Sequence, residues 1–375
     1  MTRIIFTVTN DLTCDQRMQR ICASLSGDGY EVVLAGRRLG SSGPLHSYPF
    51  RQKRIFCIFT AGFLFYAEYN FRLFFWLLFQ KADILCAIDL DTILPVYLVS
   101  GLLQRTRVYD AHELFTEQKE IITRPLIHRC WLGIEKFFVP RFLNGYTVND
   151  FIAGELQKRY GVNYAVIRNL PLKKYFPRGG GAERFIIYQG AVNEGRSFET
   201  LLPAMKNIGI KLRIYGNGNY FEKVRSMIKE LQLEEKVLLM GAVSPDELKH
   251  ITPDATLAVM LFERTGLNQI YSLSNRFFDY IMAGVPQICV AYPEYKKIND
   301  VYQVALMIDD TGTSTIEAAI KHLLGSPELC EQLHKNAVIA RETLNWQLEE
   351  KKLLAFYSRI SRSVKALKNG PAEIF

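Results

Sequence analysis

The residue types best suited to chemistry lie in "SLSNRFFDYIMAGVP", residues 272–286. Ser274 and Asn275 favour the start of a helix, where backbone amides and the positive end of the helix dipole attract an anion. Arg276 adds a full positive charge beside them. Asp279, about one turn later, would repel a phosphate but can accept hydrogen bonds from ribose hydroxyls. The stretch therefore fits a nucleoside diphosphate, and an exposed acid on an amphipathic helix is the structural alternative.

A second segment, "YQGAVNEGRSFETLL" at residues 188–202, has matching properties. Gly190 directly follows a predicted strand, where a glycine lets a ligand approach the backbone. Arg196 precedes the next predicted helix, and its guanidinium suits two-point binding of phosphate. Gly216 follows the next strand and is a weaker signal of the same kind. The alternative interpretation of Arg196 is a surface arginine after a turn.

The first half of the chain contributes a histidine and a polar loop. In "YDAHELF", His112 and Glu113 follow a predicted strand. A histidine there can hydrogen-bond a substrate sugar or a departing phosphate, and a purely structural hydrogen bond is the alternative. Asn10, Asp11 and Thr13 lie in the loop after the first strand, where they could contact an acceptor or the diphosphate.

Several other chemistries are not supported. The first strand is not followed by GxGxxG, which argues against an NAD or FAD enzyme. "DLDT", residues 89–92, has the DxD spacing of a divalent-metal site, but we expect Asp91 to cap the following helix. We therefore expect no metal site. No nucleophile–histidine–acid set or carboxylate pair is evident, so hydrolysis is not indicated.

The elements that must position these residues alternate between apolar strand-length runs and helix-period segments. This alternation predicts α/β architecture with doubly wound parallel sheets. "SPDELKHI" adds a capping box, with Ser244 three residues before Glu247. A chain of 375 residues is too long for one ordinary core. The alternation breaks at "LPLKKYFPRGGGAER", whose proline and glycine content predicts a linker.

We therefore predict two Rossmann-like domains. Ligands bind beyond the carboxyl ends of parallel strands, so the two domains are expected to face a cleft. The expected boundaries are an acceptor-side domain at 1–168, a linker at 169–184, a nucleotide-binding domain at 185–345 and a C-terminal helix at 346–375 that packs back across the interdomain region.

Composition narrows the environment. The seven cysteines are scattered without a CxxC pair, which predicts reduced thiols in a cytoplasmic protein. A strand pattern starts at the N-terminus, so we expect no signal peptide. The net charge is +8, yet basic residues are dispersed and no nucleic-acid motif occurs, so no nucleic-acid partner is expected.

Residues 51–81 are rich in aromatic side chains and begin with three basic residues. Glu68, Asn70 and Arg72 interrupt the apolar run, which is too short to span a bilayer. Contact with a membrane surface and packing as a buried helix are the two alternatives.

Taken together, these motifs resemble the GT-B glycosyltransferases, specifically retaining family 4 and a bacterial subgroup that builds surface polysaccharides. "SLSNRFFDYIMAGVP" and "YQGAVNEGR" carry the resemblance in the second half, and "TNDLTCDQRMQRICASLSGDGYEVVLAGR" and "VYDAHELF" in the first. It implies a nucleotide-sugar donor and a glycan acceptor, and we expect no cofactor. The basic chain with its aromatic-rich segment also fits a lipid-linked acceptor. By position, Asp279 would bind the ribose, Arg196 with the Ser274–Asn275 segment the diphosphate, and His112 the donor sugar or its phosphate.

Two positions depart from the family pattern. The lysine usual five residues after the arginine is Leu201, although Arg276 stands where a lysine is usual. The acid usual eight residues before Asp279 is Tyr271, so we expect Glu263 or Asn268 to contact the donor sugar.

The predicted function is transfer of a sugar from a nucleotide donor to a growing glycan in polysaccharide biosynthesis, in the cytoplasm or at the inner face of a membrane. Fixed cations and helix amides would stabilise charge on the β-phosphate without a metal. A sugar-nucleotide epimerase of the same fold would need carboxylates around the sugar carbon. A non-catalytic scaffold of a glycan assembly complex would fit the departures at 201 and 271.

Overall fold

The computed structural model describes residues 1–13, 15–40, 42–174 and 183–369. The chain divides into two compact units, which we describe separately. Unit 1 comprises Met1–Asn169 and Glu349–Phe375, and unit 2 comprises Leu170–Leu348. Half of the predicted linker, residues 175–182, lies outside the described residues.

Unit 1 is built on a seven-stranded sheet with the order β3-β2-β1-β4-β5-β6-β7, in which every pair is parallel. The strands are β1 (Arg3–Asp11), β2 (Glu31–Arg38), β3 (Arg51–Phe56), β4 (Ile84–Ile88), β5 (Thr106–Ala111), β6 (Gly145–Thr147) and β7 (Ala165–Val166). The helices are α1 (Gln16–Gly27), α2 (Gly62–Leu78), α3 (Ile93–Leu102), α4 (Lys119–Ile122), α5 (Pro125–Phe138), α6 (Asp150–Tyr160) and most of α15 (Trp346–Asn369).

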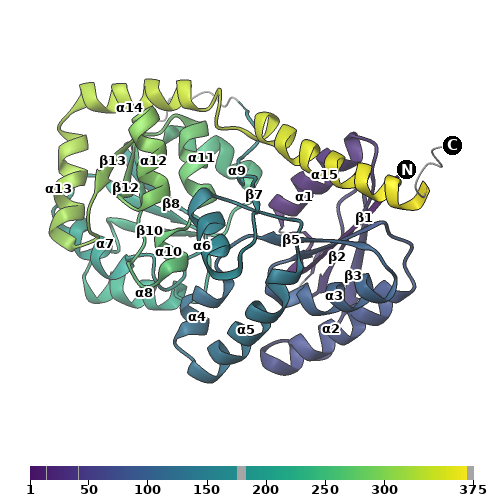
Figure 1. The fold of residues 1–375 in the computed structure, drawn as a ribbon. Coiled ribbons are helices and arrows are strands. Elements are labelled where there is room, and N and C mark those ends of the chain that lie inside the picture. Colours follow the sequence, from purple (N-terminus) through teal and green to yellow (C-terminus); the bar gives the residue numbers. More distant parts are fainter. Residues whose placement is uncertain (14, 41, 175–182, 370–375) are drawn as a thin grey trace. The chain divides into compact units, whose positions relative to one another are not determined.

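Helices cover both faces of this sheet. Figure 1 shows α1 and α15 on one side and α2, α3 and α5 on the other. The side chain of Asp15 caps α1 by accepting a hydrogen bond from the Met18 amide. In α15, Tyr357 packs edge-on against Phe6 of β1 at 5.9 Å between ring centroids. The C-terminal helix is therefore part of the hydrophobic core of unit 1.

The segment 51–81 is not one helix. Its basic start, Arg51–Phe56, forms the edge strand β3, and α2 begins at Gly62. An edge strand suits these residues because charged side chains can reach water there and discourage pairing with another chain. Among the described residues, no helix is long and apolar enough to cross a membrane.

Unit 2 has a six-stranded parallel sheet with the order β10-β9-β8-β11-β12-β13. The strands are β8 (Phe185–Gln189), β9 (Lys211–Tyr215), β10 (Val237–Gly241), β11 (Leu257–Met260), β12 (Gln287–Val290) and β13 (Ala305–Ile308). The helices are α7 (Phe198–Ala204), α8 (Phe221–Glu230), α9 (Pro245–Ile251), α10 (Leu267–Ile270), α11 (Asn275–Ala283), α12 (Pro293–Tyr302), α13 (Thr313–Leu324) and α14 (Pro327–Ala340). The predicted capping box of α9, Ser244 with Glu247, is confirmed.

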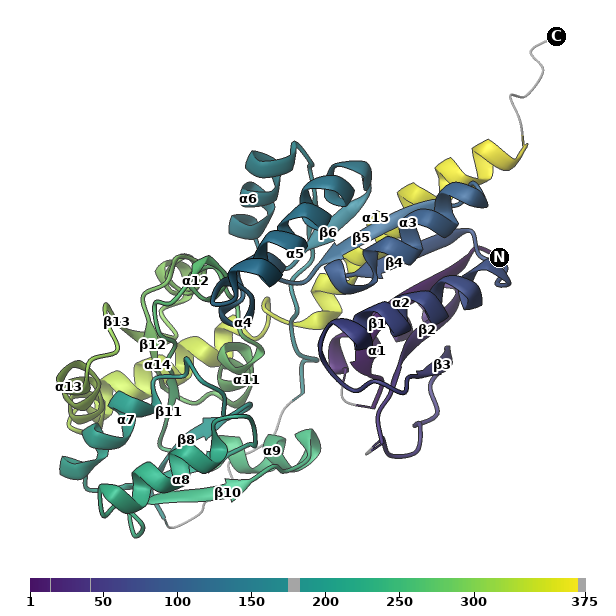
Figure 2. The ribbon, with the colours of Figure 1, turned by 90° about the horizontal axis from the view of Figure 1, so that it is seen from below.

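In each sheet the strand order reverses once, between β1 and β4 in unit 1 and between β8 and β11 in unit 2 (Figure 2). Crossover loops on the two sides of such a point diverge and leave room at the carboxyl ends of the strands, where ligands bind. The residues that follow β1, β4, β8 and β11 are therefore the ones to examine for function.

Candidate functional site

Two arginines converge on one phenyl ring in unit 2. Arg196 ends the loop between β8 and α7, and its guanidinium carbon lies 4.2 Å from the centre of the Phe262 ring, just after β11. Arg276, in the first turn of α11, lies 5.3 Å from the same ring and 4.3 Å from that of Tyr188 in β8. The Tyr292 hydroxyl donates a hydrogen bond to the Phe262 carbonyl at 2.8 Å. Guanidinium groups stacked on aromatic faces keep their N–H edges directed sideways, where they can bind a phosphate.

Arg276 lies deeper than the sequence suggested, with only 6% of its surface exposed. Its Nη1 atom has no hydrogen-bond partner among the described residues. A buried cationic donor without an acceptor is unfavourable, and an anion at this position would relieve the penalty. Gly190 lies beside it with φ +113°, and a Cβ there would stand 3.8 Å from the Arg276 Cδ. Gly190 thus adopts, next to the buried arginine, a positive-φ backbone conformation that other residues rarely take.

Asp279 lies one helical turn beyond Arg276 and is partly exposed. Its Oδ2 accepts a hydrogen bond of 3.3 Å from the side chain of Gln189, the last residue of β8. The other side-chain atom of Gln189, Oε1, contacts the Thr252 hydroxyl at 2.7 Å, and its backbone amide donates to the Tyr280 hydroxyl at 3.2 Å. These contacts hold the carboxylate at the end of β8, beside the arginine pair.

The start of α11 differs in detail from the prediction. Ser274 does occupy the N-cap position, but its side chain makes no capping hydrogen bond, and Asn275 is exposed. The backbone amide of Ser274 donates to the Tyr295 hydroxyl at 2.9 Å. The expectation that this amide is available to an anion is therefore wrong, because a tyrosine two elements further along the chain already accepts from it.

Gly216 directly follows β9 and is packed against the loop after β8. A Cβ on Gly216 would stand 1.8 Å from the carbonyl oxygen of Gly190, and its φ is +153°. A glycine is required here because the loops after β8 and β9 pack backbone against backbone. Gly216 therefore allows the loop after β9 to pack closely against the loop that carries Gly190.

The two departures from the family pattern look different in three dimensions. Leu201 is fully buried in the hydrophobic core of unit 2, on the inner face of α7. A lysine at that position would place its charge in the core. Tyr271 follows α10, which contains Asn268, and both are partly buried. The Glu263 amide donates to the Gly195 carbonyl at 3.1 Å, which ties the loop after β11 to the one that ends at Arg196.

In unit 1, the polar loop after β1 is held together by its own contacts. The Asp11 carboxylate accepts hydrogen bonds from the Thr13 amide (3.0 Å) and hydroxyl (2.8 Å) and from the Ser42 hydroxyl, and it pairs with Arg54 at 3.1 Å. Burial would raise the pKa of Asp11, but the hydrogen bonds from Ser42 and Thr13 and the charge of Arg54 lower it to about 2. The side-chain amide of Asn10 donates a hydrogen bond of 3.0 Å to the carboxylate of Asp15, the N-cap residue of α1. Asp11 is thus a structural tie of this loop.

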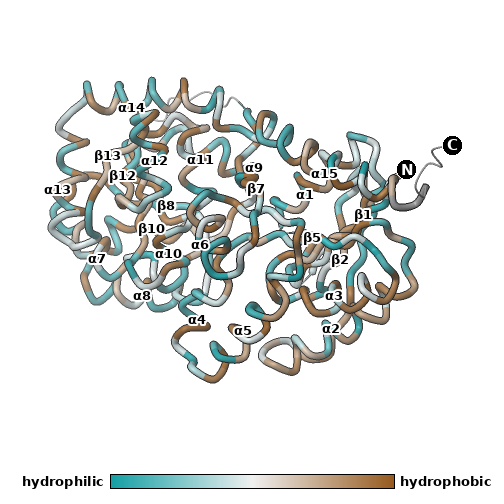
Figure 3. Tube along the Cα trace, in the orientation of Figure 1, coloured by the Kyte–Doolittle hydropathy of each residue, from teal (hydrophilic) through white to brown (hydrophobic). Residues whose placement is uncertain are grey.

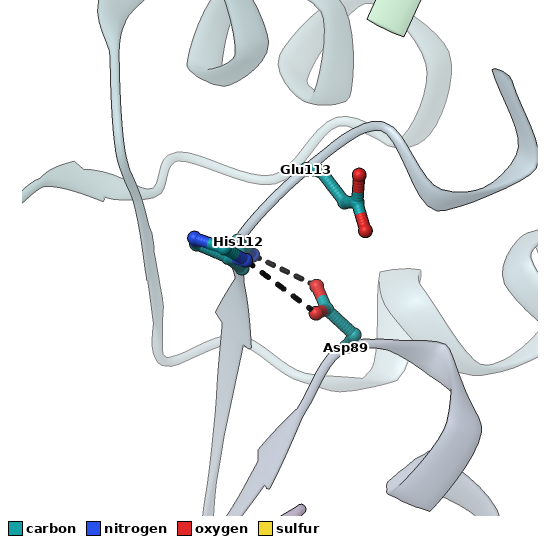
Figure 4. Close-up of side chains that lie close together, drawn as sticks. All are labelled: Asp89, His112 and Glu113. Carbon is teal, nitrogen blue, oxygen red and sulfur yellow. Dashed lines mark hydrogen bonds and ion pairs between the residues drawn. The ribbon is translucent and has the colours of Figure 1, made fainter. Parts of the chain in front are cut away.

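A second group gathers after β4 and β5 (Figure 4). Asp89 has a left-handed backbone, with φ +54°, and its Oδ1 accepts a hydrogen bond of 2.9 Å from the His112 amide. The His112 Nδ1 lies 4.0 Å from the other carboxylate oxygen. Glu113 completes a set whose ligand atoms lie within 4.8 Å of one another, so these three residues could hold a metal ion. Burial and the charges of Glu113, Asp91 and Asp110 raise the pKa of Asp89.

The predicted cap role of Asp91 is wrong. Asp91 lies inside the short turn Leu90–Thr92, and its carboxylate accepts a hydrogen bond from the Thr9 hydroxyl of β1. Thr92 occupies the N-cap position of α3 and makes no side-chain capping bond. The turn directs the acid back toward the sheet, and burial raises the pKa of Asp91 to about 7.

A buried ion pair that the sequence did not reveal lies beneath His112. Arg17 of α1 binds the Asp110 carboxylate of β5 through two hydrogen bonds of 2.6 and 2.8 Å, with 7% and 0% of the two residues exposed. Desolvation by the surrounding residues of unit 1 and the charge of Arg17 lower the pKa of His112, although 43% of its side chain is exposed. The one sequence feature that could have predicted the Arg17–Asp110 pair is the position of Asp110, two residues before His112. Phe262 and Gln189 were missed as well, because both look like ends of apolar strands.

Comparisons with known proteins bear on the fold and on the class of enzyme. Residues 179–338 match the family model "Glycosyl transferases group 1". A comparison with curated protein sequences gives no significant match. Among solved structures, sucrose-phosphate synthase from Thermosynechococcus elongatus has a TM-score of 0.80 at 14% identity, over 97% of this chain and 100% of that one. HepE from Anabaena, in complex with UDP-glucose, gives 0.73 at 11% identity, over 96% and 100%. WaaG, a glycosyltransferase involved in lipopolysaccharide biosynthesis, gives 0.71 at 14%, over 94% and 99%.

Two parallel-sheet Rossmann-like units, with these structural neighbours, define the GT-B fold. Together with the family match, they identify the protein as a glycosyltransferase. More particularly, the match to the "Glycosyl transferases group 1" model falls almost entirely within unit 2. The predicted fold class and enzyme class are thereby confirmed.

Proposed function

We propose that this glycosyltransferase moves a sugar from a nucleoside-diphosphate donor to a glycan or lipid-linked acceptor in polysaccharide biosynthesis, as a retaining enzyme of family 4. The observation that carries the proposal is the pair of arginines stacked on Phe262, with the Asp279 carboxylate one turn beyond Arg276. Structural neighbours were solved with such ligands: HepE with UDP-glucose and TarM from S. aureus with UDP.

In this proposal the diphosphate binds between Arg196 and Arg276, and Asp279 accepts hydrogen bonds from the ribose. The bond from the anomeric carbon to the β-phosphate oxygen breaks, and its electron pair stays on that oxygen. The acceptor hydroxyl oxygen bonds to the anomeric carbon and releases its proton. The two guanidinium groups stabilise the charge that grows on the leaving phosphate, which lowers the barrier. Glu263 and Asn268 are our candidates for contacts to the donor sugar.

Unit 1 contributes His112, with Glu113 beside it, and the loop containing Asn10, Asp11 and Thr13. We propose that His112, as a neutral imidazole, hydrogen-bonds the donor sugar or its phosphate, and that the Asn10 and Thr13 side chains contact the acceptor. We also propose a cytoplasmic location, which the six described cysteines support because all are free thiols.

We propose that the reaction needs no metal, because the arginine pair provides the positive charge. Asp89, His112 and Glu113 give a direct test, since their ligand atoms could bind a cation. Treatment with EDTA is expected to leave activity unchanged. Loss of activity that is restored by a divalent cation would contradict this part of the proposal.

Thermal unfolding of the wild type and of Arg196→Ala, with UDP, GDP, CDP, ADP and NAD in turn, tests the function. A ligand at a hundred times its dissociation constant adds about 2.7 kcal/mol to the free energy of unfolding. We expect one diphosphate to stabilise the wild type and to stabilise Arg196→Ala much less. Arg225→Ala is the matched control, because Arg225 is an exposed arginine of α8 that pairs with Glu222.

Incubation with the identified donor alone then distinguishes a transferase from an epimerase and from a non-catalytic scaffold. A transferase hydrolyses a donor slowly in the absence of acceptor, an epimerase converts it, and a scaffold leaves it unchanged. Stabilisation by none of the diphosphates, or by NAD alone, would refute the proposed function.

A further inference from the structure

Helix α2 is apolar on two opposite faces. Phe65, Tyr69, Leu73 and Leu77 recur every fourth residue and are buried against the sheet. A second series, offset by two residues, faces outward. It consists of Phe63, Phe71 and Phe75 of the helix and of Phe79, its C-cap residue, which are 83%, 65%, 45% and 83% exposed. Two residues correspond to about 200° of rotation around a helix, so the two series lie on opposite sides. A helix that is apolar all round is expected to be covered on both sides.

The neighbouring helices repeat this outward apolar pattern. Along α3, Leu94, Leu98 and Leu102 recur every fourth residue and are exposed. On α5, Leu126 is 80% exposed and Phe137 is 48% exposed. Helix α3 packs against both α2 and α5, on the same face of the unit 1 sheet (Figures 1 and 2). Figure 3 shows hydrophobic colouring along α2 and α3. We call the outward surfaces of α2, α3 and α5 the apolar face.

The charges on these three helices have a consistent sign. Arg72 of α2 and Arg129 and Lys136 of α5 are exposed. The two acids of the helices are withdrawn. Glu68 is 12% exposed, pairs with Arg72 and accepts hydrogen bonds from two backbone amides of the loop before α2. Glu135 is 2% exposed and bonds with Thr116 and Tyr160. Because Arg72 is paired with Glu68, the net positive charge of the apolar face comes from Arg129 and Lys136 of α5.

We propose that the apolar face is a docking surface for an anionic lipid bilayer. Exposed phenylalanine and leucine side chains would enter the interface between headgroups and acyl chains, and the basic residues would meet anionic headgroups. An unpartnered apolar surface that extends over three helices is unusual for a soluble monomer. Positive charge with withdrawn acids favours an anionic surface over a neutral or basic protein partner. This inference does not depend on the proposed sugar transfer.

The apolar face differs in two respects from the membrane contact predicted for residues 51–81. The basic residues at its start belong to the edge strand β3 and are separate from the outward phenylalanines of α2. The surface also includes α3 and α5, which lie outside that segment. Removing α2 residues alone should therefore weaken binding to a membrane without abolishing it.

Flotation of the full-length protein with vesicles tests the proposal. We expect the protein to float with vesicles made of equal parts phosphatidylglycerol and phosphatidylcholine, and much less with pure phosphatidylcholine. In the triple variant Phe63→Ser, Phe71→Ser and Phe79→Ser, partitioning into the anionic vesicles should fall roughly tenfold or more. Arg129→Gln with Lys136→Gln should weaken binding at low salt and leave little difference at high salt.

The matched control replaces three exposed apolar residues of unit 2, Met240, Val301 and Ile339, with serine. These changes should leave flotation unchanged, and circular dichroism would confirm that each variant is folded. The proposal is overturned if the wild type does not float with anionic vesicles, or if the control reduces flotation as much as the phenylalanine variant. A dimer in solution that the phenylalanine variant alone converts to monomer would show that a second copy covers the face, which also overturns it.

Discussion

Arg196 and Arg276 stack on the same aromatic ring, that of Phe262, at 4.2 and 5.3 Å from its centre. One arginine precedes α7 and the other begins α11, so two separate elements of unit 2 bring their charges together. Two guanidinium groups this close repel each other, and the aromatic ring compensates only in part. A bound diphosphate would neutralise the positive charge of the two guanidinium groups.

The first prediction concerns the planar shape of Arg276. Arg276→Lys keeps the charge but loses the stacking on Tyr188 and Phe262 and the two-point hydrogen bonding. We expect the dissociation constant for the preferred nucleoside diphosphate to rise about tenfold, or about 1.4 kcal/mol. Isothermal titration calorimetry on the folded variant measures this, with Arg225→Lys on exposed α8 as control. Equal affinity of wild type and Arg276→Lys would show that the diphosphate does not contact this side chain.

The second prediction concerns Asp279 and the ribose. Asp279→Asn removes a charged acceptor, and a hydrogen bond to a charged group is worth about 1.5–3 kcal/mol. We expect weaker binding of the ribonucleoside diphosphate, and little change for the analogue that lacks both ribose hydroxyls. The control is Asp300→Asn, an exposed acid of α12. If both nucleotides weaken equally, Asp279 acts on the fold or on the diphosphate and not on the ribose.

The third prediction concerns the missing lysine. Because Leu201 is 0% exposed in the core of unit 2, Leu201→Lys should destabilise the protein by about 3–5 kcal/mol. It should also fail to strengthen nucleotide binding. Leu201→Met, of similar volume, should cost less than about 1.5 kcal/mol. Denaturant unfolding measures both, and a stable Leu201→Lys protein with tighter nucleotide binding would show that position 201 reaches the ligand.

The fourth prediction concerns pH. Hydrogen bonds and Arg54 lower the pKa of Asp11 from 3.8 to about 2, so the folded state favours the ionised acid more than the unfolded state does. Its contribution, about 2 kcal/mol, is complete above the unfolded pKa and is lost as the pH falls from there toward the folded pKa. We expect Asp11→Asn to lower the free energy of unfolding near pH 7 and to matter less near pH 3. The exposed Asp28→Asn serves as control, and a cost for Asp11→Asn that does not change with pH would contradict the assignment.

The sequence by itself determined the features that depend on neighbours along the chain. The alternation of apolar runs and helical periods fixed two parallel-sheet units, because strand and helix periods differ. The capping box of α9, with Ser244 and Glu247, needs only residues three apart. The start of α11 at Asn275 and the placement of Asp279 one turn beyond Arg276 follow from the same local rules.

Only the tertiary structure decided which side chains meet across the sheets. Phe262 contacts both Arg196 and Arg276, and Gly216 packs against the Gly190 carbonyl. Asp110 accepts hydrogen bonds from Arg17. These contacts form because the strand order places distant loops side by side. Leu201 and Arg276 each lie in a helix beside apolar residues. The packing of unit 2 nevertheless places Leu201 in the hydrophobic core and Arg276 next to Phe262. Local periodicity specifies which face of a helix is apolar, but the partners on each face follow from non-local packing, which no spacing along the chain encodes.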